Sequence, residues 1–309
     1  FVPAQTDWAT FLWPHMSSIY DGTGKTEVNG AKIGRYNLIT TNYFSGSGYQ
    51  VITHEFMHTL GYPDMYIYNS GTFTDPIGNW TMMSGNTGYP TVWERERYGG
   101  WVSEEQIPTI SKNGFYELSD ASKNPETNTI AYKINVPNSD EFFMVEYRNQ
   151  NANEYEALVP NTGIIVYRVD PDRYGNSVGD PEVYVLRNSG YGSYSAALTG
   201  DINRTSIDLK LKSGKETGYK IEFVSKNNDK ATFKLVKDTK PLEIKDFTVN
   251  PQSPIGVGNS IPLNVDAANG SGKYTYSFGT IFNGRENYFV KDSEDSTYSF
   301  SPTGVFPTS

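Results

Sequence analysis

The chain has 309 residues, a formal net charge of −9 and no cysteine. The missing cysteines exclude disulfides and thiolate metal sites, and without a Lys/Arg cluster nothing indicates a nucleic-acid surface or an anionic-membrane surface. No apolar run approaches the roughly 20 residues that span a bilayer, so a transmembrane protein is not expected. The 23 tyrosines and 29 glycines favour β-rich, loop-rich domains of the secreted type.

Three stretches of different composition follow one another along the chain. Residues 1–112 hold all three histidines and contain the most helix-like sequence. Residues 113–239 alternate apolar and polar side chains in runs such as GIIVYRVD and ATFKLV, which predicts a β-sandwich domain. Residues 240–309 combine a Pro/Gly-punctuated entry with the runs IPLNVDA and KYTYSF, which predicts a small immunoglobulin-like domain, either whole or truncated. The fold class we expect is α+β.

The decisive motif lies in GYQVITHEFMHTLGYPDMY, residues 48–66. Two histidines four residues apart, His54 and His58, lie on one face of a helix and can bind one tetrahedral zinc ion. Glu55 flanks that face, where it can act as the general base for a zinc-activated water. Apolar residues also recur every four positions on the opposite face, where we expect them to anchor the helix in a core: Ile52, Phe56 and Leu60.

A third ligand has to come from outside this helix. Gly61 predicts the helix end, because it tolerates a positive φ, and Pro63 prevents the helix from resuming. The turn between them can bring Asp64 under the metal, so we expect Asp64 as the third ligand. Glu94 and Glu96, in a predicted helix after Pro90, are the alternatives.

At these residues the sequence resembles the immune inhibitor A family of secreted bacterial zinc metallopeptidases, within the wider metzincin-like group. The segment GNWTMMSGNTGYP (78–90) is similar to that family's tryptophan-and-methionine turn, which would make Met83, or alternatively Met82, the Met-turn residue below the metal. The stretches PTVWERERYGGWV (90–102) and FFMVEYRNQN (142–151) resemble the family as well. The resemblance implies a metzincin-like zinc-helix catalytic region, followed by the β-sandwich and immunoglobulin-like domains.

Several further residues have a structural and a functional interpretation. His15 could line the cleft and Tyr89 could stabilise the oxyanion, but a structural role is favoured for both. The loop VDPDRYGNSVGD gathers oxygen ligands that could bind calcium, although a solvated turn is favoured: Asp170, Asp172, Asn176 and Asp180. Glu146 and Arg148, two apart on one strand, are interpreted as a surface ion pair that contributes little.

The function that the sequence predicts is a secreted zinc metalloendopeptidase that hydrolyses extracellular proteins. Its expected cofactor is Zn²⁺, held by His54, His58 and Asp64, with Ca²⁺ as a weaker expectation. Its expected partners are protein or peptide substrates and, through the C-terminal domain, a cell surface or a glycan. The alternative is an inactive peptidase-like surface protein that acts in adhesion or glycan binding.

Overall fold

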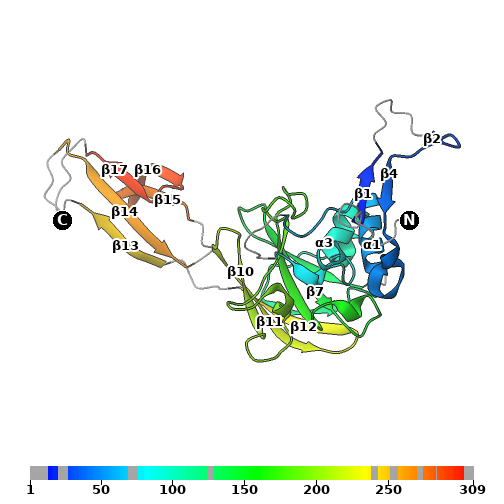
Figure 1. Ribbon diagram of the computed structural model, residues 1–309. Coiled ribbons are helices and arrows are strands. Elements are labelled where there is room, and N and C mark those ends of the chain that lie inside the picture. The colour runs from blue at the N-terminus through cyan, green and yellow to red at the C-terminus, as the bar shows by residue number, and fades with distance from the viewer. Residues whose placement is uncertain are drawn as a thin grey trace. The chain divides into compact units, whose positions relative to one another are not determined.

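The computed structural model of the chain describes residues 13–19, 27–68, 75–123, 128–237, 243–250, 257–269, 274–282 and 284–302. Strands make up 40% of the described residues and helices 16%. The chain divides into two compact units, one of residues 1–215 with 220–236 and one of residues 216–219 with 237–309. Figure 1 shows their elements.

The expected fold class, α+β with a metzincin-like catalytic region followed by β domains, is wrong, because strands dominate this chain. In the described part of residues 1–112, only α1 (Tyr49–Thr59) exceeds five helical residues, since glycines and prolines interrupt the sequence after it. The other helices are short: η2 (Thr41–Phe44), η3 (Gly46–Gly48), η4 (Gly78–Trp80), α2 (Met82–Gly85), α3 (Val92–Glu94), the π-helix η5 (Arg95–Gly99), η6 (Glu104–Gln106), η7 (Glu156–Leu158) and η8 (Ser193–Ser195).

The first strands form only two-stranded antiparallel ribbons. β1 (His15–Ser18) pairs with β4 (Arg35–Leu38), and β2 (Glu27–Val28) pairs with β3 (Ala31–Lys32). The β1–β4 ribbon lies beside α1 (Figure 1). These ribbons are too small to form the sheet of a catalytic domain by themselves.

Two four-stranded sheets form the body of the larger unit. The first has the order β6-β7-β8-β9 and is antiparallel throughout: β6 (Ala131–Asn135), β7 (Phe142–Arg148), β8 (Gly163–Val169) and β9 (Val183–Val185). The second has the order β10-β11-β12-β5: β10 (Ser206–Lys210), β11 (Glu216–Lys226), β12 (Lys230–Lys237) and β5 (Gly114–Ser119). The sheets meet where the Tyr132 ring packs 5.7 Å from that of Phe233.

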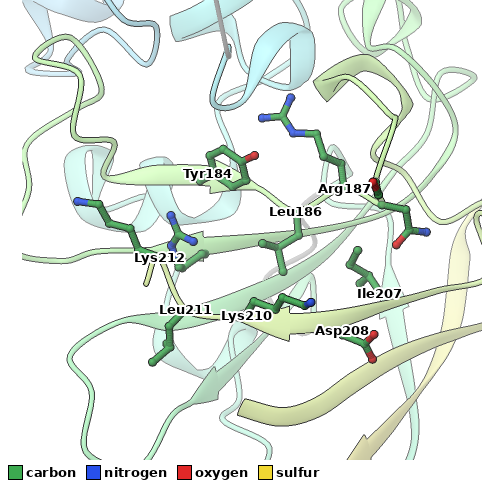
Figure 2. A pocket seen from close by; sticks show the side chains of 11 residues that line it. Tyr184, Leu186, Arg187, Ile207, Asp208, Lys210, Leu211 and Lys212 are labelled. Atoms are coloured by element: carbon green, nitrogen blue, oxygen red, sulfur yellow. The ribbon is translucent and has the colours of Figure 1, made fainter. Parts of the chain in front are cut away.

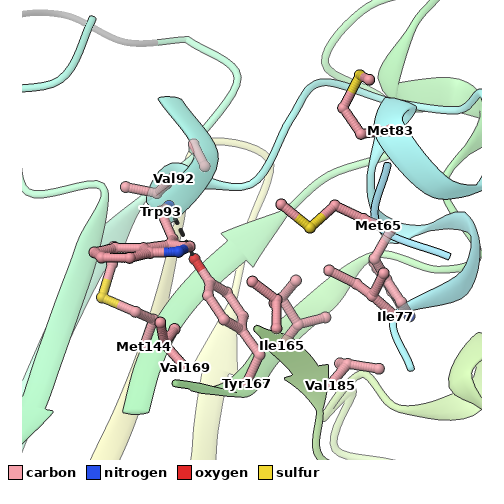
Figure 3. Packing of buried hydrophobic residues seen from close by; sticks show 14 of the residues in the cluster. Met65, Ile77, Met83, Val92, Trp93, Met144, Ile165, Tyr167, Val169 and Val185 are labelled. Atoms are coloured by element: carbon pink, nitrogen blue, oxygen red, sulfur yellow. Dashed lines mark hydrogen bonds between the residues drawn. The ribbon is translucent and has the colours of Figure 1, made fainter. Parts of the chain in front are cut away.

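The central strands β7 and β8 are buried at every position, so both faces of the first sheet are covered. Phe142 and Met144 of β7 belong to a hydrophobic cluster that also contains Met57 of α1. Figure 3 shows this packing, with residues of β7 and β8 below Met65, Ile77 and Met83. The region that carries the predicted zinc motif therefore shares one core with the first sheet.

The helix α1 is oriented differently from the expectation that its Ile52, Phe56 and Leu60 face enters a core. Phe56 is 51% exposed and Leu60 44% exposed, whereas His54, Glu55 and Met57 are buried. That expectation is wrong, because α1 packs on the rest of the unit through its histidine-bearing side. Tertiary contacts decide which side of an amphipathic helix is covered.

The described residues of the smaller unit form two small sheets. One has the order β13-β14-β17, and the other pairs β15 with β16: β13 (Glu243–Val249), β14 (Ile261–Ala268), β15 (Tyr276–Phe282), β16 (Arg285–Ser293) and β17 (Thr297–Phe300). Stacked aromatic rings join them, with Phe289 4.4 Å from Phe300 and Phe278 5.7 Å from Tyr298. In the described part of the chain, no helix has both the length and the apolar character needed to cross a bilayer.

Candidate metal centre

The two ends of α1 fix the position of its histidines. Before the helix, Gly48 passes so close to the backbone of Tyr43 that a Cβ at position 48 would lie 2.2 Å from the Tyr43 carbonyl oxygen. After the helix, Gly61 has a φ of +103°, which favours glycine, and Arg35 of β4 donates to the Thr59 carbonyl at 2.8 Å. The predicted turn after the helix is therefore present.

His54, His58 and Asp64 converge at one point. The two Nε2 atoms lie 3.1 Å apart, and the Asp64 Oδ1 atom lies 3.1 Å from His54 Nε2 and 3.3 Å from His58 Nε2. Among the described residues, these three form the one group of three or more His, Asp or Glu side chains that could hold a metal ion. The third ligand predicted from the turn lies with the histidines, and the alternatives Glu94 and Glu96 do not.

Hydrogen bonds on the far side of each ring decide what the converging atoms can do. His54 Nδ1 contacts the Met82 carbonyl at 2.9 Å, and His58 Nδ1 contacts the Tyr62 carbonyl at 2.7 Å. Because a carbonyl only accepts, each Nδ1 carries the proton, and each Nε2 of a neutral ring is left with a lone pair. Asp64 Oδ1 is buried and has no hydrogen-bond partner in this state. Three acceptors thus face one another.

A zinc ion fits this arrangement. With bonds of about 2.0–2.1 Å, a tetrahedral zinc holds its ligand atoms about 3.3 Å apart. The observed separations of 3.1 to 3.3 Å agree with that spacing. Three protein ligands leave the fourth tetrahedral position for water or substrate, which is the arrangement of catalytic zinc sites.

Protons can also satisfy these three acceptor atoms in place of a metal ion. Burial alone would raise the pKa of Asp64, but hydrogen bonds that His54 and His58 donate once their Nε2 atoms are protonated, and that of Tyr68, outweigh it and hold that pKa well below its usual range. Burial alone would lower the pKa of His58, but its hydrogen bond and charge interaction with Asp64 leave it above 6.5. Protons and a metal ion therefore compete for the same site.

A distant loop holds the third ligand in place. The Asn176 backbone N–H donates to the Asp64 carbonyl at 2.9 Å, and the Asn176 amide donates to the Met65 carbonyl at 2.8 Å. Gly175 packs against the same turn at a φ of +65°, and a Cβ there would lie 2.7 Å from the Asp64 carbonyl oxygen. The buried Glu182 accepts from the Gly175 N–H at 2.6 Å and closes the loop.

These contacts favour a structural role over calcium binding for the loop VDPDRYGNSVGD. Asn176 is completely buried and uses its amide on backbone groups. Asp170 accepts from the Asp172 N–H at 3.2 Å, and Asp180 forms ion pairs with Arg173 and Lys212. The side-chain oxygens of Asn176 and Asp180 are therefore engaged with protein groups.

A pocket of about 310 Å³ opens beside His54, one of the three converging ligands. His54, Glu55 and Tyr66 line it together with residues of the 79–86 segment. The Tyr66 ring lies 6.5 Å from the His54 ring, and burial raises the pKa of its hydroxyl to about 12. Tyr68 donates to Asp64 Oδ2, the carboxylate oxygen that does not face the histidines.

Sequence reasoning missed both of these tyrosines. They lie two and four residues after Asp64, and this short separation could have indicated that they lie near the metal centre. Tyr89, for which the sequence favours a structural role over oxyanion stabilisation, is not among the lining residues of this pocket; its ring packs 5.7 Å from Tyr155. His15 is the first residue of β1 and its ring packs between those of Trp13 and Tyr36, so it is not part of the ligand group.

The alternative ligands Glu94 and Glu96 have other environments. Glu94 is completely buried, accepts from the Thr91 N–H at 2.8 Å and from the Thr81 hydroxyl at 2.9 Å, and caps α3. Burial raises its pKa to about 7. Glu96 is half-buried beside a different pocket.

The segment that resembles a Met-turn supports the site mainly through its backbone. The Met82 carbonyl orients His54, and the Met83 carbonyl accepts from the Met65 N–H at 2.8 Å. Both methionine side chains are buried in the hydrophobic cluster. The segment thus ties the histidine helix to the turn that carries Asp64.

The interpretation of Glu146 and Arg148 as a surface ion pair is wrong. Both are buried, and Arg148 donates to Glu156 at 2.5 Å, to the Trp80 carbonyl at 2.6 Å and to Glu146 at 3.3 Å. Alternation along β7 put the pair on one face, but only the tertiary structure places the 78–90 segment over that face. The network joins this segment to the first sheet.

Comparison with known proteins finds no matching family model, no matching curated protein and no matching solved structure. The resemblance to the immune inhibitor A family therefore stays a prediction that rests on the sequence motifs.

Proposed function

We propose that this chain is a zinc-dependent metallopeptidase. The observation that carries the proposal is the convergence of three acceptor atoms, His54 Nε2, His58 Nε2 and Asp64 Oδ1, within 3.3 Å of one another. Buried acceptors that face one another are costly unless a cation lies between them. A glutamate directly after the first histidine, in the same pocket, gives the site a group that a purely structural metal would not require.

The roles of the residues follow from their places in the pocket. Zinc held by His54, His58 and Asp64 would supply a Lewis acid that polarises the scissile carbonyl and lowers the pKa of a water molecule. Glu55 accepts the proton of the attacking water and delivers it to the departing amine. Tyr66, whose hydroxyl stays protonated at neutral pH, donates to the developing negative charge on the carbonyl oxygen.

The substrates we propose are extracellular proteins, cleaved by a secreted bacterial enzyme. The tyrosine- and glycine-rich composition and the motifs that resemble immune inhibitor A support this proposal. Contact with a cell surface or a glycan through the C-terminal unit belongs to the same proposal.

The test combines metal analysis with one conservative variant. The full chain and its Glu55→Gln variant are analysed for zinc by mass spectrometry and for cleavage of casein. Both should carry about one zinc per chain, and the variant should lose about 10²–10⁴-fold in cleavage rate because it lacks the general base. Glu105→Gln, a change at an exposed glutamate of η6, is the matched control and should cleave normally.

Equal cleavage by the wild type and Glu55→Gln would reject this mechanism. Stoichiometric zinc without any cleavage by the wild type would favour the inactive, adhesive alternative.

A further inference from the structure

Three surface pockets of the larger unit adjoin one another, starting at the metal centre. The pocket with His54 and Glu55 shares Asp75 with a second pocket of about 480 Å³. That pocket in turn shares Tyr184 and Arg187, among other residues, with a third pocket of about 670 Å³. Each pocket therefore shares lining residues with the next, as an extended peptide-binding site requires.

The third pocket lies between the edge strands of the two four-stranded sheets. Figure 2 shows Tyr184 and Arg187 on one side, and Asp208 and Lys210 of β10 on the other. Its lining contains four cationic side chains and one carboxylate, in a chain whose net charge is −9: Arg168, Arg187, Lys210, Lys212 and Asp208. Positive charge is thus concentrated in a pocket of an acidic protein.

Two of these four cations have a carboxylate partner, whereas Arg187 has none among the residues that the structure describes. Arg168 pairs with Glu141 at 3.2 Å, and Lys212 pairs with Asp180. Arg187 donates only to two backbone carbonyls, those of Asp75 at 2.8 Å and Pro76 at 3.3 Å, and forms no ion pair within the described part of the chain.

The surroundings of Arg187 reduce its contact with water. Its Nε is buried without a hydrogen-bond partner, and its guanidinium lies 4.7 Å from the centre of the Tyr184 ring. Arg168 also approaches this ring, at 5.2 Å. A partly desolvated guanidinium without a counter-ion attracts an anion, and a guanidinium binds a carboxylate especially well.

We infer that the three pockets form one extended substrate site, and that Arg187 selects peptides that carry a carboxylate at a fixed distance from the scissile bond. The inference rests on the proposed peptidase function and adds a substrate class to it. The carboxylate is that of an aspartate or glutamate side chain, or of the peptide C-terminus.

The test measures selectivity and not only activity. The full-length protein cleaves a series of quenched fluorescent peptides in which one glutamate is moved through every position on either side of the cleaved bond. Each peptide is compared with its glutamine counterpart, and each is made with a free and with an amidated C-terminus. At one position glutamate should raise kcat/KM about tenfold over glutamine. An effect of the free C-terminus alone would assign the site to the terminal carboxylate.

Variants of Arg187 link this preference to the third pocket. Arg187→Gln should abolish the preference for the carboxylate, so that the glutamate and glutamine peptides are cleaved with kcat/KM values within about twofold of each other. Arg187→Glu should favour a lysine peptide of the same register. Arg204→Gln, which changes an arginine paired with Asp201 outside the three pockets, is the matched control and should keep the preference.

Binding to the Glu55→Gln variant supplies a second readout. Fluorescence anisotropy should show tighter binding of the glutamate peptide, and salt should weaken the difference. Proteolysis without any carboxylate preference, or a preference that persists in Arg187→Gln, would overturn this inference and leave the peptidase proposal intact. A wild-type protein that carries zinc but cleaves none of the peptides would overturn both.

Discussion

Zinc should stabilise the larger unit strongly, because the folded chain assembles a site that the unfolded chain lacks. The unfolded chain has only three histidines and no cysteine with which to bind the metal. At free zinc 1,000-fold above Kd, the linkage relation gives about 4 kcal/mol. For a unit of this size, 1 kcal/mol raises Tm by about 2–4 °C, so the expected increase is about 8–16 °C.

Zinc stabilises the folded unit because it satisfies a buried acceptor that otherwise has no partner. Without a cation, Asp64 Oδ1 stays buried and unpaired, 3.1 and 3.3 Å from two other acceptors. One unsatisfied buried acceptor costs about 1–3 kcal/mol, and more for a charged group.

The assay is thermal unfolding followed by circular dichroism, with chelator and then with added zinc. His54→Ala should unfold at the same temperature with and without zinc. His15→Ala removes the one histidine outside the cluster and should keep the whole shift, which makes it the matched control. Calcium added in place of zinc should restore little. A zinc shift below about 2 °C in the wild type, or the same shift in His54→Ala, would refute the assignment of the metal centre.

Three other predictions follow from the supporting contacts. Arg148→Ala should destabilise the unit by about 3–5 kcal/mol in urea unfolding, because it leaves buried carboxylates unpaired; a loss below about 1 kcal/mol would contradict the buried network. Gly175→Ala should weaken zinc binding at least about tenfold, because the added Cβ would collide with the turn that carries Asp64. Gly179→Ala is the matched control: Gly179 also has a positive φ, of +84°, but a Cβ there would meet no other atom, so this variant should bind zinc normally. Equal zinc affinity in the two glycine variants would rule out that coupling. Since the His58 pKa is raised above 6.5 in the metal-free protein, zinc affinity should fall on acidification already above pH 6.5, and calorimetric titration from pH 8 to pH 5.5 measures where the decline begins.

Some features of the site could be predicted from local sequence. The spacing of His54 and His58 places both rings on one side of any helix. Gly61 and Pro63 end that helix at once, which brings Asp64 back to the histidines within a few residues. Such features depend on contacts between residues close together in the sequence, and the spacing of those residues predicts these contacts.

Other features depended on contacts over long separations, and the sequence patterns misjudged them. Ile52, Phe56 and Leu60 repeat as a buried helix face would, yet α1 is covered on its histidine side by the 82–83 segment. Glu146 and Arg148 alternate as a solvated strand face would, yet Trp80 and Glu156 cover them.

The chemical groups available at the site can be read from the residues alone: two imidazoles one helical turn apart, a glutamate beside them and an aspartate after a tight turn. The strand-dominated fold, the loop around Asn176 that holds Asp64, and the backbone carbonyls that bind Arg187 became visible only in the folded chain. The physical reason is that ligand spacing on a helix is local geometry. Burial and charge compensation are instead set by segments about a hundred residues apart, such as Asp64 and Asn176, which meet only in the folded chain.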